Sequence, residues 1–158
     1  HIRRQRQMCI RDRHKEGTMT VGTMRLKMQK IMQNYAGVFR NDENLKKGVE
    51  ELTQLYHSFH EVGIQDKSRI FNTEYIELLE LKNLLDNALV TMYSANFRKE
   101  SRGAHSHEDY PERDDENWLI HSLGYLNSKD VSLKTRNVIR ETLDETEIHA
   151  IPLAKRVY

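Results

Sequence analysis

Two groups of histidine and acidic side chains in this sequence have a spacing that could bind a metal ion. His57-x-x-His60 places two imidazoles one helical turn apart, and His105-x-His107-x-Asp109 places three ligand groups on alternate residues. Alternate side chains of an extended segment point to the same side, so the second group is the better candidate. A metal site needs three or four converging ligands. We therefore assign no metal ligand, and expect surface histidines in the first group and an ion-paired loop in the second.

The sequence carries no recognisable set of catalytic residues. None of its serines is flanked by the glycines of a nucleophile elbow. Its 7 glycines are dispersed, so neither a dinucleotide-binding fingerprint nor a phosphate-binding loop is present. The single cysteine, Cys9, cannot form an internal disulfide. We therefore expect no catalytic residue and no cofactor-binding residue in this chain.

The densest concentration of charge lies between residues 98 and 116. Its first two arginines, four residues apart, fall at the end of a predicted helix, where cations interact favourably with the helix dipole. So many opposite charges indicate a fixed ion-pair network, which is useful at an interface between domains or subunits. A solvated charged loop is the alternative. The candidate interface residues are Arg98, Glu100, Arg102, His105, Arg113, Asp114 and Asp115.

Length and composition favour one helical domain. The chain has 158 residues, of which 37% are hydrophobic and 31% charged. This is polar for a globular protein but leaves enough apolar residues for a core. The composition excludes a collagen-like chain and a disulfide-stapled miniprotein, and no stretch of about 20 apolar residues predicts a membrane span. With only 7 glycines and 2 prolines, the sequence favours long uninterrupted helices.

The basic excess is confined to the N-terminal 22 residues. They carry six basic and two acidic side chains, whereas the other 136 residues are net negative. A phosphate-binding arm, a mitochondrial transit peptide and translated sequencing-adapter DNA are three interpretations, and we favour the third. We expect residues 1–22 to be a disordered basic arm, residues 23–110 a helical bundle, and residues 111–158 a short helix, a β-hairpin and a tail packed on it.

Apolar residues that recur every three or four positions predict three helices, at about 23–39, 42–62 and 74–100. Thr23 and Asp42 are plausible N-caps of the first two, and Asn72-Thr73 opens the third. The first stripe is expected to include Val38 and Phe39. The third helix has the widest apolar stripe, so it should lie between the others. Short connections then give an up-down-up bundle.

The C-terminal third has a different pattern. Asp114–Trp118 could start a short helix. Residues 119–126 and 131–136 then alternate in polarity, and the polar stretch at 127–130 between them predicts a hairpin, which must pack on something because an isolated hairpin is marginally stable. The expected fold is therefore mostly α, a three-helix bundle followed by a charged loop and a small β-hairpin, with residues 139–158 as a surface loop.

Several stretches have distinctive sequences: Ser94-Ala-Asn-Phe-Arg98, Glu100-Ser-Arg-Gly-Ala-His105, Arg113-Asp-Asp-Glu-Asn-Trp-Leu119, Met28-Gln-Lys-Ile-Met-Gln-Asn34, Val38-Phe-Arg40, Phe71-Asn-Thr73 and Lys155-Arg-Val-Tyr158. Together they resemble the C-terminal region of the succinate dehydrogenase flavoprotein subunit, over about residues 24–158. The Glu-Ser-Arg-Gly stretch is shared with fumarate reductase and L-aspartate oxidase, whereas the Arg-Asp-Asp-Glu-Asn-Trp-Leu stretch and the Arg-x-Tyr ending favour succinate dehydrogenase. The family's ending is usually proline-rich, but here only Pro152 remains, which leaves the path of the last residues open.

The resemblance implies the oxidation of succinate to fumarate by hydride transfer to a covalently held FAD. Electrons then pass through an iron–sulfur subunit to quinone in the membrane. In this family the FAD and substrate sites lie in upstream flavin-binding and capping domains, whose motifs are absent here. The resemblance therefore implies a helical fragment with a structural role that is inactive alone and binds no cofactor. Its expected partners are those two domains, the iron–sulfur subunit and, indirectly, the membrane anchor subunits, and we expect the Arg102→Ala substitution to weaken this association.

The expected location is peripheral, on the cytoplasmic face of the bacterial inner membrane or the matrix face of the mitochondrial membrane. A stand-alone helical interaction module is the main alternative, and fumarate reductase or L-aspartate oxidase is the alternative within the family. A nucleic-acid binder would depend on the basic arm alone, so we expect no nucleic-acid partner.

Overall fold

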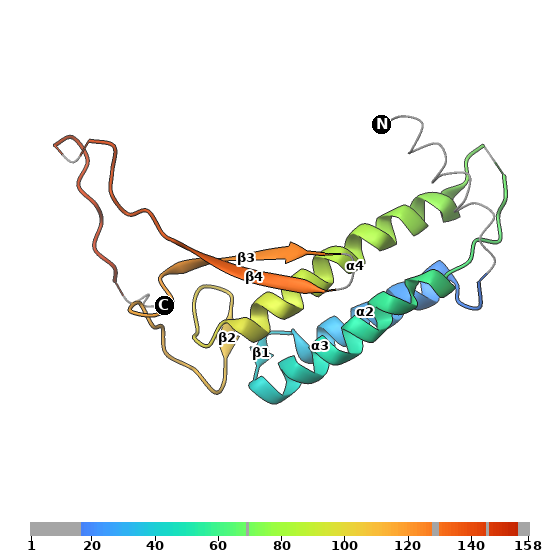
Figure 1. The fold of residues 1–158 in the computed structure, drawn as a ribbon, viewed down its shortest axis with the longest axis horizontal. Helices are drawn as coiled ribbons and strands as arrows, with labels where there is room; N and C mark the ends of the chain where they lie inside the picture. Colours follow the sequence, from blue (N-terminus) through green and yellow to red (C-terminus); the bar gives the residue numbers. More distant parts are fainter. Residues whose placement is uncertain (1–16, 69, 128–129, 145, 155–158) are drawn as a thin grey trace.

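The computed structural model describes residues 17–68, 70–127, 130–144 and 146–154 (Figure 1). Within these ranges lie three α-helices, α2 (Val21–Tyr35), α3 (Asp42–His57) and α4 (Thr73–Phe97), with a 3₁₀ turn, η1 (Ser58–Glu61), after α3. Strand β1 (Phe39–Arg40) pairs in parallel with β2 (Ser106–His107), and β3 (Ile120–Leu126) pairs antiparallel with β4 (Val131–Asn137). The predicted three-helix bundle with a C-terminal hairpin is confirmed.

Each helix begins at a polar side chain that caps its first turn. The side-chain oxygens of Thr20, Asn41 and Asn72 accept hydrogen bonds from backbone N–H groups three residues further on, at 3.2, 2.8 and 2.8 Å. Such caps satisfy backbone donors that the helix itself leaves unpaired. The predicted start of the third helix at Asn72-Thr73 is thus confirmed. The predicted caps Thr23 and Asp42 were wrong: the caps are Thr20, three residues earlier, and Asn41, one residue earlier. The apolar periodicity does not locate a cap, because the capping residue lies outside the helix.

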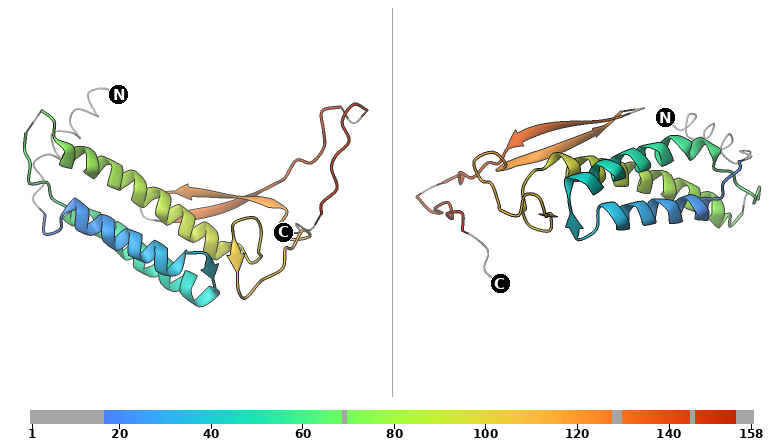
Figure 2. Two further views of the ribbon diagram at one scale, coloured as in Figure 1. Left: turned by 180° about the vertical axis from the view of Figure 1, so that it is seen from behind. Right: turned by 90° about the horizontal axis from the view of Figure 1, so that it is seen from below.

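The core is the space between the three helices. The apolar residues that face it are buried, and they lie on the predicted stripes: Met24 and Met28 of α2, Leu45 and Leu52 of α3, and Leu81, Leu85, Leu89 and Met92 of α4. The largest contribution comes from α4, the longest helix, which packs on both α2 and α3 (Figure 2). Burial of this apolar surface is the main stabilising contribution to such a bundle.

Two ends of the predicted helices are wrong. Val38 and Phe39, expected on the first apolar stripe, are each 72% exposed, because α2 ends at Tyr35 and the chain turns into β1. Helix α4 ends at Phe97 rather than near residue 100, because Arg98 adopts an extended backbone with φ −82° and ψ 114°. This change of direction leads the chain into the charged loop.

The hairpin packs along α4. Gly124 of β3 makes the close approach possible, because a Cβ there would lie 2.5 Å from Cγ1 of Val90. Val131 of β4 is buried in the same core cluster, and Leu126 and Leu133 pack against it. The support that an isolated hairpin needs is therefore supplied by the bundle itself.

Residues 111–119, after the loop, contain a turn rather than the expected short helix. The Asp114 carboxylate accepts the N–H groups of Glu116 and Asn117 at 3.1 and 3.0 Å, and this side chain completes a single turn over Asp115–Asn117. Beyond β4, the described part of the tail runs as an extended loop away from the bundle rather than over its surface (Figures 1 and 2). Its apolar residues Ile139, Leu143, Ile148 and Ile151 are at least 65% exposed.

The expected arm boundary at residue 22 falls inside the fold. Thr20 caps α2, Val21 is 2% exposed, and Met19 forms a β-bridge with Val62. The structured chain therefore extends N-terminal to the expected boundary. Residues 1–16, which include Cys9 and most of the basic excess, lie outside the described residues.

Candidate functional site

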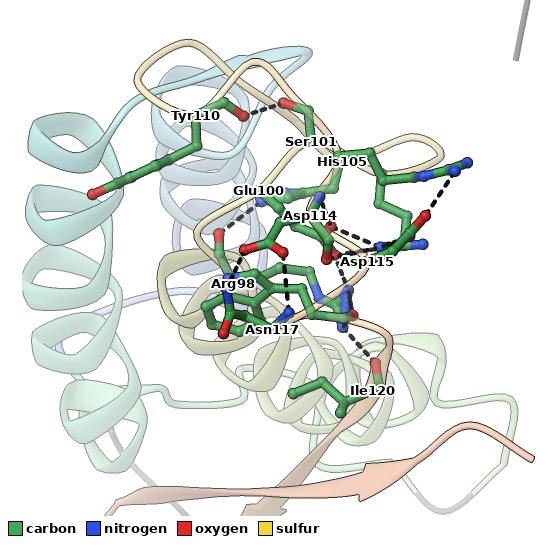
Figure 3. Close-up of polar contacts among 12 residues, drawn as sticks. Arg98, Glu100, Ser101, His105, Tyr110, Asp114, Asp115, Asn117 and Ile120 are labelled. Atoms are coloured by element: carbon green, nitrogen blue, oxygen red, sulfur yellow. Dashed lines mark hydrogen bonds and ion pairs between the residues drawn. The ribbon is translucent and has the colours of Figure 1, made fainter. Parts of the chain in front are cut away.

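The charged loop is organised around one buried carboxylate. Glu100 is fully buried just after α4 and accepts hydrogen bonds from two arginines and a backbone N–H (Figure 3). Its two oxygens lie 2.8 Å from Nε and 2.9 Å from Nη2 of Arg102, a bidentate pair, and Oε2 also accepts the N–H of Asp114 at 3.0 Å. A buried charge is tolerated only when it is paired and hydrogen-bonded in this way.

Arg98 connects this carboxylate to the hairpin. Its guanidinium donates to Glu100 and also to the carbonyl oxygens of Trp118 and Ile120, the residues that lead into β3. The guanidinium carbon lies 5.6 Å from the centroid of the Trp118 ring, and the same ring packs edge-on against Phe97. Arg98 therefore fixes the start of the hairpin to the end of α4.

Arg102 connects the carboxylate to the outer part of the loop. Its Nη2 lies 2.7 Å from Oδ1 of Asp115, and this hydrogen bond lowers the pKa of the Asp115 carboxyl. Its bond to Glu100 raises the pKa of the Arg102 guanidinium. Arg113 closes the chain of ion pairs, with Nη2 at 2.8 Å from Oδ2 of Asp115 and Nη1 donating to the Ala154 carbonyl.

His105 is held between two arginines on the other side of the loop. Its Nδ1 lies 2.8 Å from Nη1 of Arg40, and its Nε2 lies 3.2 Å from the carbonyl oxygen of Arg98. Arginine can only donate, so Nδ1 accepts and the proton is on Nε2. Burial lowers the pKa of this imidazole, and the nearby positive charges lower it further.

This environment predicts a loss of stability in mild acid. The pKa of His105 is lowered in the folded state, whereas the unfolded chain titrates near the ordinary value of 6.5, so the unfolded chain binds more protons as the pH falls toward and below that value. The free energy of unfolding should therefore decrease from about pH 7.5 to about pH 5.5, and level off below the folded-state pKa. Urea unfolding at both pH values measures this change. It should shrink in His105→Gln and persist in the exposed control His60→Gln; an unchanged slope in His105→Gln would contradict it.

The seven candidate residues thus come together in one connected network, but it is more deeply embedded than the sequence indicates. Glu100 has no exposed surface, and the Arg98 side chain is 14% exposed. Arg113 and Asp115 are the more accessible members, at 31% and 29%. Within the described residues the network joins parts of the same domain.

The two groups of histidine and acidic residues with metal-ligand spacing do not each form one cluster. His60 bonds the backbone oxygen of His57 through Nδ1 at 2.6 Å, beside the end of α3. Both ring nitrogens of His105 are engaged by Arg40 and Arg98, so they are not available to a site with His107 and Asp109. Those two residues lie instead beside the first residue of α3.

Sequence reasoning missed two residues that the structure places in or beside the network. Arg40 reaches His105 across 65 positions because the parallel pairing of β1 and β2 brings their segments together. Lys99 forms an ion pair with Asp42 at 2.6 Å, across 57 positions. Strands of two residues have no readable alternation, so no local signal could have revealed either contact.

Comparison with known proteins gives a consistent result. A family model described as the C-terminal region of the fumarate reductase flavoprotein matches residues 25–158. A succinate dehydrogenase flavoprotein subunit of Rickettsia bellii is 48% identical over 147 residues, which are 92% of this chain and 24% of the relative. The mitochondrial succinate dehydrogenase (ubiquinone) flavoprotein subunit of Oryza sativa subsp. japonica is also 48% identical, over 146 residues, 92% of this chain and 23% of the relative.

Solved structures agree with the sequence relatives. The E. coli quinol fumarate reductase FrdA superposes with a TM-score of 0.85 at 33% identity, covering 97% of this chain and 25% of that chain. The Mycobacterium smegmatis Sdh1 complex superposes with a TM-score of 0.75 at 20% identity, which supports the fold alone.

The three-helix bundle, the charged loop and the hairpin together define the C-terminal helical domain of a flavoprotein oxidoreductase subunit. The chain belongs to the succinate dehydrogenase/fumarate reductase flavoprotein family, as its C-terminal domain. It spans about a quarter of the length of the relatives that it matches. No helix in the described part of the chain has the length and apolar character needed to cross a membrane.

Proposed function

We propose that this chain is the structural C-terminal domain of a succinate dehydrogenase flavoprotein subunit. The observation that carries the proposal is the match at 48% identity, over 92% of the chain, to succinate dehydrogenase subunits. The reaction of the whole subunit is then the oxidation of succinate to fumarate, with hydride transfer to a covalently bound FAD. The flavin-binding and capping domains supply the reacting groups, and this domain supports them.

Exposed apolar surface supports a role in packing against further protein. Helix α4 presents Ile76, Leu79 and Leu84 to solvent, at 55%, 43% and 42% exposure, on the side away from the bundle core. The tail has four further exposed apolar residues, which lie toward the opposite end of the molecule from the start of α4 (Figure 1). Exposed apolar surface of this extent is a mark of interaction sites. We assign this surface to contact with the flavin-binding and capping domains.

The charged loop supplies polar contacts to the proposed interfaces, including the one with the iron–sulfur subunit. Arg113 and Asp115 are its accessible members, and charges at an interface rim favour correct association. Arg102→Ala, the variant that the sequence suggested, is a poor probe because Arg102 pairs with the buried Glu100, so its loss would destabilise the domain itself. Arg113→Ala is the better probe, because Arg113 bonds only Asp115 and Ala154 among the described contacts.

A chimera tests the proposal. Residues 25–158 of this chain would replace the matching C-terminal part of the Rickettsia bellii subunit, co-expressed with its iron–sulfur subunit and membrane anchor subunits. The chimera should hold flavin covalently, retain the iron–sulfur subunit at the membrane and reduce a dye in the presence of succinate. A chimera that is folded and flavin-loaded but neither assembles nor turns over succinate would contradict the proposal.

Within that chimera, Arg113→Ala tests the charged loop. It should reduce the amount of co-purified iron–sulfur subunit, with the largest difference from the parent at low salt, where the exposed charge is least screened, and leave the absorbance of bound flavin unchanged. Lys47→Ala is the matched control, since Lys47 forms an exposed pair with Glu43 on α3, apart from the loop. Equal retention of the subunit in both variants at every salt concentration would exclude a role of Arg113 in the interface.

The proposed location follows from the partners. The complex would lie on the cytoplasmic face of a bacterial inner membrane or on the matrix face of the mitochondrial membrane. This domain would be peripheral there, held through the iron–sulfur subunit and, indirectly, through the membrane anchors.

A further inference from the structure

Three ligand-type side chains from separate segments converge beside the charged loop. Asp42 is the first residue of α3, His107 lies in β2, and Asp109 follows in the next turn. One ligand atom from each lies within 4.8 Å of the others, the spacing of groups that share a metal ion. His107 and Asp109 belong to the spaced group His105-x-His107-x-Asp109, and Asp42 rather than His105 is the third member of the cluster.

His107 is the second observation that points to a ligand. It is 1% exposed, and neither of its ring nitrogens has a hydrogen-bond partner among the described residues. Its Nε2 faces the cluster, 3.2 Å from Oδ1 of Asp42, and its ring packs against Tyr110 at 4.8 Å between centroids. Nε2 thus has only an ion-pair contact with Asp42, and neither ring nitrogen forms a hydrogen bond. A buried imidazole without hydrogen bonds costs free energy, which a bond to a metal would offset.

The surrounding backbone holds the three groups in place. The N–H of Asp42 donates to Oδ2 of Asp109 at 2.8 Å, which leaves Oδ1 of Asp109 available. The N–H of Glu108 donates to the carbonyl of Arg40 at 2.7 Å, and the β1–β2 pairing fixes the register of the segment that carries His107. Asp109 is exposed, so a bound ion would retain an open position for water.

We propose that Asp42, His107 and Asp109 bind a divalent transition-metal ion, with Zn²⁺ as the best match. An imidazole nitrogen with two carboxylates suits zinc, whereas Mg²⁺ and Ca²⁺ prefer oxygen ligands alone. Three protein ligands and one water complete a tetrahedral shell. The ion would link the start of α3 to the turn after β2. It would thereby stabilise the region of the two-residue strands β1 and β2.

Lys99 is the competitor for this site. Its ammonium lies 2.6 Å from Oδ1 of Asp42, and this hydrogen bond lowers the pKa of the Asp42 carboxyl. A metal ion and the ammonium would share one carboxylate, so zinc binding must displace Lys99. Removal of this positive charge should therefore increase the affinity for zinc.

Titration of the full chain with ZnCl₂ tests the proposal. The chain would carry Cys9→Ser, which removes its single thiol. Proton–nitrogen NMR spectra of the imidazoles should show a saturable, one-to-one shift of the His107 ring nitrogens, with no such shift on addition of MgCl₂. Asp109→Asn preserves the acceptor for the Asp42 N–H and should weaken zinc binding by about tenfold or more. Lys99→Gln should tighten it.

His60→Asn is the matched control, because His60 is exposed at the far end of α3 and its loss should leave the zinc affinity unchanged. Circular dichroism verifies that each variant keeps its helices. The proposal fails if the His107 nitrogens do not shift at about millimolar zinc, or if Asp109→Asn binds zinc as tightly as the parent chain. It also fails if His60→Asn, rather than Asp109→Asn, abolishes binding.

Discussion

Glu100→Gln should lower the free energy of unfolding by about 3–5 kcal/mol. The substitution keeps the size of the side chain but removes the charge that two arginines share. Arg98 and Arg102 would then face each other with no anion between them, at side-chain exposures of only 14% and 25%. Loss of one partner from a buried ion pair is costly because the remaining charge stays desolvated. Urea unfolding followed by circular dichroism measures the effect.

Glu116→Gln is the matched control for this prediction. Glu116 lies in the turn of the same loop and is exposed, so its neutralisation should change stability by about 0.5 kcal/mol or less. A Glu100→Gln variant as stable as the Glu116→Gln control would show that the network around Glu100 contributes little to the fold.

Leu85→Ala should lower the free energy of unfolding by about 2–5 kcal/mol. Leu85 is fully buried where α4 faces the bundle core, and the shorter side chain would leave a cavity that its neighbours can only partly fill. Because alanine is a good helix former, the loss reports packing rather than helix propensity. Thermal and urea unfolding measure the change.

The neighbouring residue provides the control. Leu84 is 42% exposed on the side of α4 away from the core, so Leu84→Ala should cost about 1 kcal/mol or less. If the two variants lost equal stability, the assignment of the buried and exposed sides of α4 would be wrong.

The elements that rest on repeated local patterns could be predicted from the sequence. The spacing of apolar residues identified the three helices, since an amphipathic helix repeats every 3.6 residues. It did not delimit the buried face of α4, because its wide predicted stripe included Ile76, Leu79 and Leu84, which are exposed. The hairpin followed from alternating polarity, because both of its strands have one face on α4. These patterns are predictive because each one reflects which side of an element is buried, and many residues contribute to it.

The details that depend on one or two residues could not be predicted. The short parallel pairing of β1 with β2 joins positions 39–40 to 106–107, and two-residue strands leave no pattern in the sequence. The position of Glu100 shows the same limit: the charge density predicted an ion-pair network, but only the fold shows that the carboxylate is its buried centre. Asp114 bonds the backbone as a helix cap would, but only a single turn follows, because the chain enters β3 at Ile120.

Association with the flavin-containing part of a relative tests the central claim most directly. The purified chain would be mixed with the Rickettsia bellii subunit that lacks its own matching C-terminal part, and the mass of the complex measured by light scattering after size exclusion. The proposed function predicts a one-to-one complex with a dissociation constant of about 1 μM or tighter, which should weaken when Leu79 on the exposed side of α4 is changed to Asp. Two folded components that remain separate at about 100 μM, two orders of magnitude above the predicted dissociation constant, would contradict the claim that this chain is the structural domain of such a subunit.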